Sequence, residues 1–283
     1  MLVVLDRVSA ASTKEGCNMP NVTMTNGLIV TILVVSAAVS GLVACKRLLH
    51  VDELREHNDV TDPMSQVVGM MFAVLLGFMV SDAMQRFEGA RATVQQEAAS
   101  LADVFQLAHG LSDEQKNKIH TLCSDYANLV VSEEWPLLAQ RKTSKRTWKT
   151  YDKLWQTCTA LKPKDEGESN IQQTILQAIT SLGDNRRLRI EALHNGLSPV
   201  LWGVLLVGGV TTILFTYFFG LQNIRMQIVM TSIVSLVICL NIFLLACFDD
   251  PFSGDVMVAP AAFEVDQKIF KMAMDPNVEY EQW

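Results

Sequence analysis

The chain is too apolar for an ordinary soluble protein and too charged to lie within a membrane throughout. Of its 283 residues, 49% are hydrophobic and 19% are charged, and the mean hydropathy is +0.22. The formal net charge of −7 argues against a nucleic-acid partner, because no basic stripe is present that would neutralise phosphates. We therefore expect a protein that combines membrane spans with a soluble part.

Four segments contain no Asp, Glu, Lys or Arg over lengths that can cross a bilayer. They cover residues 27–45, 63–81, 197–221 and 226–248. The region between the second and third segments is charged and has the size of a domain. The sequence predicts an all-α, polytopic membrane protein with four transmembrane helices and a helical cytoplasmic insert between spans 2 and 3.

The predicted division of the chain follows from these segments. An N-terminal tail (1–26) precedes transmembrane helices 1 and 2 (27–81). A helical cytoplasmic domain (82–196) continues helix 2. A transmembrane hairpin of helices 3 and 4 (197–248) follows, because only four residues, 222–225, separate these two spans, and a C-terminal cytoplasmic tail (249–283) completes the chain.

The second span leads directly into the soluble region. Its nineteen residues, 63–81, cover roughly 28 Å at helical rise, about the thickness of a hydrocarbon core. Beyond Ser81 the sequence becomes charged, but up to Arg91 it contains no Pro and only Gly89 as a weak helix breaker. We expect one helix, beginning at Asp62-Pro63, to leave the membrane and enter water unbroken.

Two stripes of residues, each spaced by four, lie side by side on this helix. The small residues are Gly69, Ala73 and Gly77, and the large apolar residues are Met70, Val74 and Phe78. The small stripe lets helix backbones approach closely in lipid. The large stripe either faces lipid or faces an axis shared by several copies, where it would form a hydrophobic constriction that gates ions by dewetting.

The charged insert contains only helical patterns. Apolar residues recur at helical spacing in the ranges 101–108, 119–130, 151–161 and 171–182. Ser112 and Ser169 are predicted N-caps, and the segment 162–169 has the composition of a loop. We expect these helices to extend the membrane bundle as antiparallel neighbours.

Basic residues near the ends of the spans predict the orientation. One side carries nine, namely Arg7, Lys14, Arg86, Arg91, Arg186, Arg187, Arg189, Lys268 and Lys271, and the opposite side carries four, namely Lys46, Arg47, Arg55 and Arg225. The excess predicts a multi-pass protein of the bacterial inner (cytoplasmic) membrane with the soluble domain and both termini in the cytoplasm.

No sequence pattern supports enzymatic activity. Walker, Gly-x-Gly-x-x-Gly, His-Glu-x-x-His and Gly-x-Ser-x-Gly motifs are absent, and no two of the six cysteines form a Cys-x-x-Cys pair. We expect no catalytic residues and no required cofactor.

Acidic residues after the fourth span form a candidate cation site. Asp249, Asp250 and Asp255 surround a Pro-Phe-Ser-Gly turn, so carboxylates and turn carbonyls can converge on a hard cation such as Ca²⁺. The alternative is a helix end followed by a surface turn whose acids stay in water. Calcium is therefore an optional ligand in this prediction.

Two of these stretches resemble the bestrophins. The run LGFMVSDAMQRFEGA, Leu76 to Ala90, resembles the second-helix segment of that family, in which Leu-Gly-Phe-x-Val is followed by Arg and an aromatic residue, here Arg86 and Phe87. The sequence DPFSGD, Asp250 to Asp255, is similar to the Asn-Pro-Phe-Gly-acidic calcium clasp of animal bestrophins, with fewer consecutive acids. Overall the chain is similar to the bacterial bestrophin-like membrane proteins.

The resemblance implies a homopentameric ion channel with a single axial pore. Bestrophins line their neck with apolar residues of the second helix at four-residue spacing, which implies Met70, Val74 and Phe78 as the neck residues here. Asp82 and Arg86 follow on nearly the same face, where a ring of the first would attract cations and a ring of the second anions. If they pair at i, i+4, neither ring faces the pore strongly, and the sign of the permeating ion stays open.

Together these observations predict a homo-oligomeric, bestrophin-type channel that conducts small inorganic ions and is surrounded by membrane lipid. The alternative is a non-conducting scaffold or sensor that uses the same helices for packing against partners. That alternative predicts a dimer or a partner-bound assembly in which Met70, Val74 and Phe78 are buried against other helices.

Overall fold

The computed structural model describes residues 23–48, 58–219 and 223–275, and every regular element in this part of the chain is helical. The longer helices are α2 (Met24–Leu48), α4 (Asn58–Leu107), α5 (Asp113–Leu129), α7 (Lys145–Thr159), α8 (Glu166–Ala192), α9 (Pro199–Phe215), α10 (Ile224–Asp249) and α11 (Ala261–Met274). Three short helical turns are η1 (Ala108–Gly110), the π-helical η2 (Val130–Glu134) and α6 (Trp135–Leu138). The predicted all-α class is confirmed.

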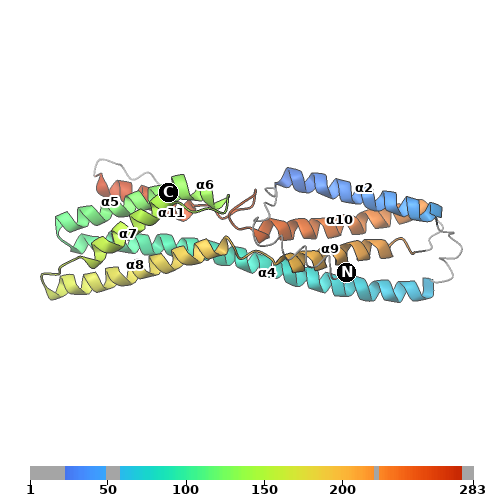
Figure 1. The fold of residues 1–283 in the computed structure, drawn as a ribbon, viewed down its shortest axis with the longest axis horizontal. Helices are drawn as coiled ribbons and strands as arrows, with labels where there is room; N and C mark the ends of the chain where they lie inside the picture. The colour runs from blue at the N-terminus through green and yellow to red at the C-terminus, as the bar shows by residue number, and fades with distance from the viewer. Residues whose placement is uncertain (1–22, 49–57, 220–222, 276–283) are drawn as a thin grey trace, which may run out of the picture.

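Helix α4 is the element that joins the two halves of the molecule. Its 50 residues extend over about 75 Å. Figure 1 shows an elongated structure in which α2, α9 and α10 lie beside the first half of α4, and α5, α7, α8 and α11 lie in the other half. The helix starts at Asn58, ahead of the expected Pro63, and then continues without a break from apolar into charged sequence.

Three helices are long and apolar enough to cross a membrane: Met24–Arg47, Pro63–Gly110 and Ile224–Asp249. The remaining predicted span forms α9, which has only 17 residues and covers about 25 Å. This length is less than the roughly 30 Å of a typical hydrocarbon core. The described residues therefore contain three candidate spans and one shorter apolar helix where four spans were expected.

The apolar half is held together by one face of α4. Phe72, Leu76 and Met79 are buried and belong to a cluster with Leu205 of α9 and Leu245 of α10. Gly208 of α9 permits this contact, because a Cβ atom there would lie 2.6 Å from the Phe72 ring. Helix α2 packs along α10, and its backbone accepts a hydrogen bond at Ala38 O from the hydroxyl of Tyr217, 2.7 Å away.

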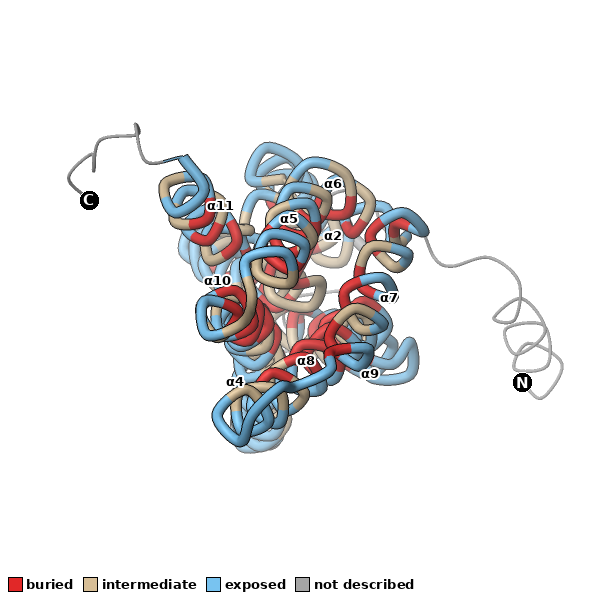
Figure 2. Tube along the Cα trace, turned by 90° about the vertical axis from the view of Figure 1, so that its left-hand side faces the viewer, coloured by how far each residue is buried: buried red, intermediate tan, exposed pale blue. Residues whose placement is uncertain are grey.

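The charged half encloses a second core. Helices α4 and α8 run side by side, and α5, α7 and α11 complete the bundle. Seen along the long axis, the buried residues face the interior of this bundle and the exposed residues face outward (Figure 2). The Phe105 ring stacks between His120 and Phe270, with centroid distances of 3.8 and 4.2 Å. Burial lowers the pKa of His120, which stabilises the neutral imidazole in this stack.

The structure differs from the sequence prediction at two places in the charged half. Helix α8 begins at Glu166 instead of Ser169, because Asp165 acts as the N-cap and its Oδ1 accepts a hydrogen bond of 2.7 Å from the backbone nitrogen of Glu168. The C-terminal region contains helix α11, which the sequence had suggested only as a tail. Phe263 and Phe270 anchor α11, since both are completely buried in the core.

A network of buried charges connects four elements of the charged half. Arg189 of α8 binds Glu97 of α4, with Nε–Oε2 2.6 Å and Nη2–Oε1 3.0 Å, and it also contacts Glu134 of η2 at 3.2 Å. Arg186 donates to Tyr126 of α5 at 2.9 Å, and Tyr126 donates to Glu97 at 2.6 Å. Burial, together with the charge of Glu97, raises the pKa of the Tyr126 hydroxyl, which therefore remains a donor.

The burial of these arginines changes the count of basic residues from which the membrane orientation was predicted. Arg186 and Arg189 are completely buried and paired, so they are not interfacial charges. Without these two, the side assigned to the cytoplasm carries seven basic residues against four. The sign of the difference is unchanged. Arg7, Lys14 and Arg55, which also entered that tally, lie outside the described residues.

Candidate functional site

The stripe of large residues on α4 is uncovered in the single chain. Met70, Val74 and Phe78 are 71%, 50% and 70% exposed, although all three are apolar. They lie on the side of α4 opposite to the buried Phe72 and Leu76. No described helix of the same chain packs on this stripe, so another molecule, lipid or a pore must adjoin it.

The stripe of small residues beside it is uncovered as well. A Cβ atom placed on Gly69 or Gly77 would meet no other atom within 4 Å, and Ala73 is exposed. Gly208 differs, because its missing Cβ is needed for packing inside the chain. The small stripe therefore leaves room for a helix backbone that does not belong to this chain.

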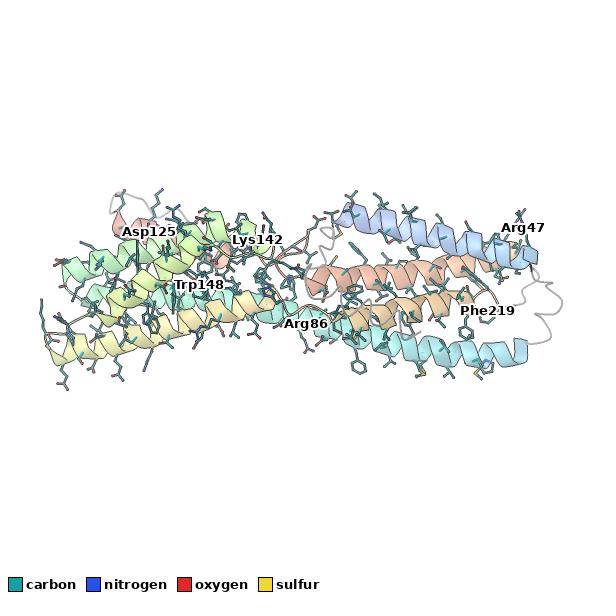
Figure 3. The ribbon with its side chains drawn as sticks, in the orientation of Figure 1. Arg47, Arg86, Asp125, Lys142, Trp148 and Phe219 are labelled. Carbon is teal, nitrogen blue, oxygen red and sulfur yellow. The ribbon has the colours of Figure 1, made fainter. Side chains whose placement is uncertain are left out.

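Charged residues begin one helical turn beyond Phe78. Asp82 and Arg86 form the i, i+4 ion pair considered from the sequence, with Oδ2–Nη1 3.4 Å. The second nitrogen of Arg86, Nη2, lies 3.5 Å from Oδ1 of Asp249. Figure 3 shows Arg86 at the junction of the two halves. One guanidinium therefore bridges α4 to the end of α10.

Asp249 is held by several donors at this junction. Its side chain is 8% exposed, and it accepts hydrogen bonds from the backbone nitrogen of Leu197 at 2.6 Å and from Nε1 of Trp202 at 3.2 Å. Leu197 lies just before α9, and Trp202 lies in the first turn of α9. Asp249 thereby ties the end of α10 to the entry of α9 and to α4.

The candidate calcium ligands have other partners. Asp250 pairs with Arg141 at 3.2 Å and also accepts from the Phe252 backbone nitrogen at 3.3 Å. Asp255 accepts from the backbone nitrogen of Met24 at 2.7 Å, at the start of α2. Within the described ranges, no group of three His, Cys, Asp or Glu side chains could hold a metal ion. The arrangement does not fit a calcium site, because the carboxylates turn toward different N–H donors instead of toward each other.

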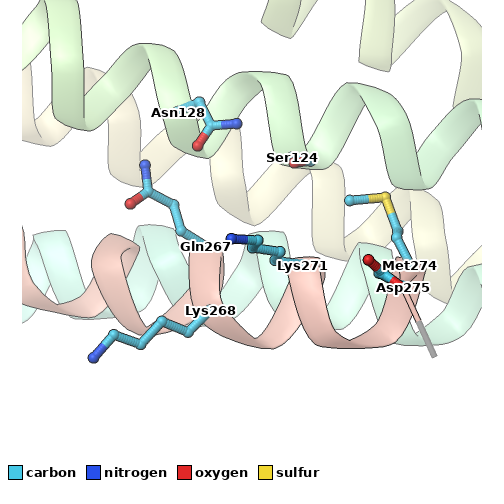
Figure 4. Close-up of a pocket in the computed structure, with 7 residues that line it drawn as sticks. All are labelled: Ser124, Asn128, Gln267, Lys268, Lys271, Met274 and Asp275. Carbon is cyan, nitrogen blue, oxygen red and sulfur yellow. The ribbon is translucent and has the colours of Figure 1, made fainter. Parts of the chain in front are cut away.

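A surface cavity is present in the described part of the charged half. It has a volume of about 410 Å³ and lies between α5 and α11 (Figure 4). Ser124, Asn128, Gln267 and Lys271 contribute polar groups to its lining. Its charged lining residues, Lys268, Lys271 and Asp275, are exposed.

Comparisons with known proteins place the chain in a family. The Bestrophin-like domain matches residues 32–263, and no curated protein matches the sequence. A crystal structure of a bacterial bestrophin homolog from Klebsiella pneumoniae, solved by Zn-SAD phasing, is similar with a TM-score of 0.61 and 15% identity, covering 91% of this chain and 100% of that chain. A mutant of such a homolog from the same organism has a TM-score of 0.63 at 14% identity, with 87% and 98% covered. At these identities the structures show a shared fold, and because the domain match covers most of the sequence, the chain belongs to the bestrophin-like family of membrane proteins.

Proposed function

We propose that this protein is a homopentameric channel that conducts small inorganic ions across the bacterial inner membrane. In this proposal Met70, Val74 and Phe78 of each copy form an apolar neck around a shared axis. The observation that carries it is the exposure of two adjacent stripes on α4, on neither of which another described helix packs. Membership in the bestrophin-like family supports the same function.

Helix geometry relates the two stripes to each other. Consecutive residues on an α-helix are rotated by about 100°, so the small stripe and the large stripe face neighbouring directions. If the small stripe contacts a neighbouring copy, the large stripe turns toward the axis of the ring. A ring of Phe78 side chains would exclude water at its narrowest point, and such a constriction gates ions by dewetting.

The other elements have roles that follow from this placement. The outward faces of α2, α9 and α10 contact lipid, as the exposed Leu33 and Val207 suggest. Helix α9 acts as the fourth span, with the residues after Phe215 and local thinning of the bilayer compensating for its short length. The charged half forms a cytoplasmic vestibule below the neck, and both termini lie on that side.

Conductance of the purified full-length protein in planar bilayers tests this function. We expect wild type to conduct and Phe78→Ala and Val74→Ala to increase the conductance severalfold, because each removes apolar bulk from the neck. Val207→Ala is the matched control, since this residue of α9 is 67% exposed and lies away from α4's stripes. Its conductance should equal that of wild type. Absence of conductance under all tested voltages and calcium concentrations would overturn the proposal.

The scaffold or sensor function remains the second candidate, because the same uncovered stripes on α4 would also fit a partner helix. Electron-microscopic images of the particle along the membrane normal separate the two. Rings with an axial hole support the channel. Dimers, or particles without a hole, support the scaffold. In that case a Cys that replaces Phe78 should also be protected from thiol reagents by the partner helix.

A further inference from the structure

Three charged side chains form a continuous row from the exposed face of α4 to the end of α10. Asp82 is nearest to the proposed neck, one turn beyond Phe78, and its side chain is 57% exposed. Arg86 is next, with 32% of its side chain exposed, and Asp249 is last, at 8%. Only Asp82 therefore lies on the surface that continues the neck, while Asp249 is inside the chain.

The single guanidinium of this row is shared between two carboxylates. Arg86 reaches Asp82 through Nη1 at 3.4 Å and Asp249 through Nη2 at 3.5 Å. The two carboxylates and the one guanidinium of this row together carry one net negative charge in each subunit. The positive charge of Arg86 is therefore divided, and Asp82 is only partly compensated.

The other groups that contact Asp249 do not change the net charge of this row. Its other donors, the backbone N–H of Leu197 and the indole N–H of Trp202, orient the carboxylate but carry no net charge. The neighbouring carboxylate of Asp250 has its own cation, because Arg141 lies 3.2 Å from it. No second cation among the described contacts compensates Asp249.

From this arrangement we propose that Asp249 is a selectivity-determining positioning residue, which holds part of the charge of Arg86 away from Asp82 and so leaves a net negative ring below the neck. The inference rests on the proposed channel function. A negative ring concentrates cations and repels anions, so the channel prefers cations. Asp249 exerts this effect without facing the pore, since it acts through the position of Arg86.

Reversal potentials in a KCl gradient across a planar bilayer test the inference with the full chain. In Asp249→Asn, Arg86 pairs with Asp82 alone, and the potassium-to-chloride permeability ratio should fall about threefold, within the range of exposed ion-pair strengths. Asp82→Asn should lower the ratio as well. Arg86→Gln should raise it, because Asp82 then has no compensating charge.

Two controls separate the shared ion pair from other effects. Trp202→Phe removes a neutral hydrogen bond to the same carboxylate and should leave the ratio at the wild-type value. In the Arg86→Gln background, adding Asp249→Asn should change nothing further, because the residue that transmits the effect is absent. Gel filtration verifies assembly of each variant. If Asp249→Asn fails to assemble, Arg86→Lys is measured in its place. The single ammonium group of a lysine at i+4 pairs with Asp82 alone, so this variant should also lower the potassium-to-chloride permeability ratio.

The outcomes distinguish this inference from the channel function itself. If wild type conducts but Asp249→Asn leaves the ratio unchanged, or if its shift persists in the Arg86→Gln background, the inference is wrong and the channel stands. If wild type does not conduct, both are wrong. A shift with Asp249→Asn that disappears without Arg86 supports the inference.

Discussion

Arg186 and Glu134 form a bidentate ion pair that is completely buried. Their atoms are joined at 2.7 Å (Nη2–Oε1) and 2.9 Å (Nη1–Oε2), and neither side chain has any exposed surface. Without Arg186, Glu134 keeps only Arg189, 3.2 Å away, which already pairs with Glu97, so two buried carboxylates share one buried cation. The pair therefore stabilises the charged half only as long as both members are present.

Replacing Arg186 by Gln should destabilise the protein strongly. We expect the free energy of unfolding to fall by about 3–5 kcal/mol, as for other broken buried ion pairs. Thermal unfolding of the detergent-solubilised protein measures this loss. The control is Arg187→Gln on the same helix, since Arg187 pairs with Asp184 at the surface and is 76% exposed. A similar midpoint for the two variants would contradict the prediction.

The stability of the charged half should also depend on Asp266. Burial raises the pKa of this α11 carboxyl to about 7, and its Oδ2 has no hydrogen-bond partner in the described part of the chain. Because the folded-state pKa is above the unfolded value of 3.8, the folded state retains the proton longer. The contribution of this carboxyl to stability is therefore fully present below about pH 4, falls as the pH rises from about 4 to about 7, and is lost above that.

Unfolding midpoints measured between pH 5 and 8 test this pH dependence. We expect Asp266→Asn to flatten the profile and to stabilise the protein at pH 8, because an amide of the same shape carries no charge to bury. Glu264→Gln is the control on the same helix, where the carboxyl is exposed, and it should retain the wild-type profile. A pH profile that is identical in wild type and Asp266→Asn would show that this carboxyl does not titrate in that range.

Oligomer assembly should depend on the small stripe of α4. Gly77→Leu adds a side chain where the single chain has open space, so the subunit should fold but fail to pack against a neighbouring copy. Native mass spectrometry in detergent would detect the shift to smaller species. Gly203→Leu on α9 is the matched control, because it is an exposed glycine with equally open surroundings. Equal oligomer distributions for both variants would place the subunit contact elsewhere.

Calcium should have little effect on this protein. Asp250 would have to leave Arg141, and Asp255 would have to leave the start of α2, before either could bind the ion. We expect the unfolding midpoint to be the same in millimolar calcium and in excess chelator. A calcium-dependent rise that is abolished by Asp255→Asn would show that these carboxylates rearrange into a site.

Local sequence patterns predicted which residues share a face of α4. Helical spacing alone identified the stripe from Met70 to Phe78 and the neighbouring Gly69 to Gly77, and it allowed for the Asp82–Arg86 pair. These relations join residues four positions apart, which helix geometry brings together wherever the helix lies. Only the packing shows that no other described helix covers either stripe.

Contacts between distant residues could not be predicted in the same way. Arg86 and Asp249 are separated by 163 positions, and the acidic neighbours of Asp249 predict a calcium-binding turn instead of this ion pair. Arg186 and Arg189 continue the spacing of the buried Ile175, Ile179 and Leu182, which is a signal that they face the interior. Charge favoured the opposite assignment, because an arginine is buried only when other elements supply its partners.

The sequence by itself determined that this protein is helical, where its apolar segments lie, and which residues share a face of the long helix. These features depend on hydrogen bonds and hydrophobic spacing within a few residues. The tertiary structure decided which charges are buried, that Asp249 shares Arg86 with Asp82, and that α11 completes the core. Those depend on groups that only the folded chain brings together, because a buried charge is stable only beside its partner.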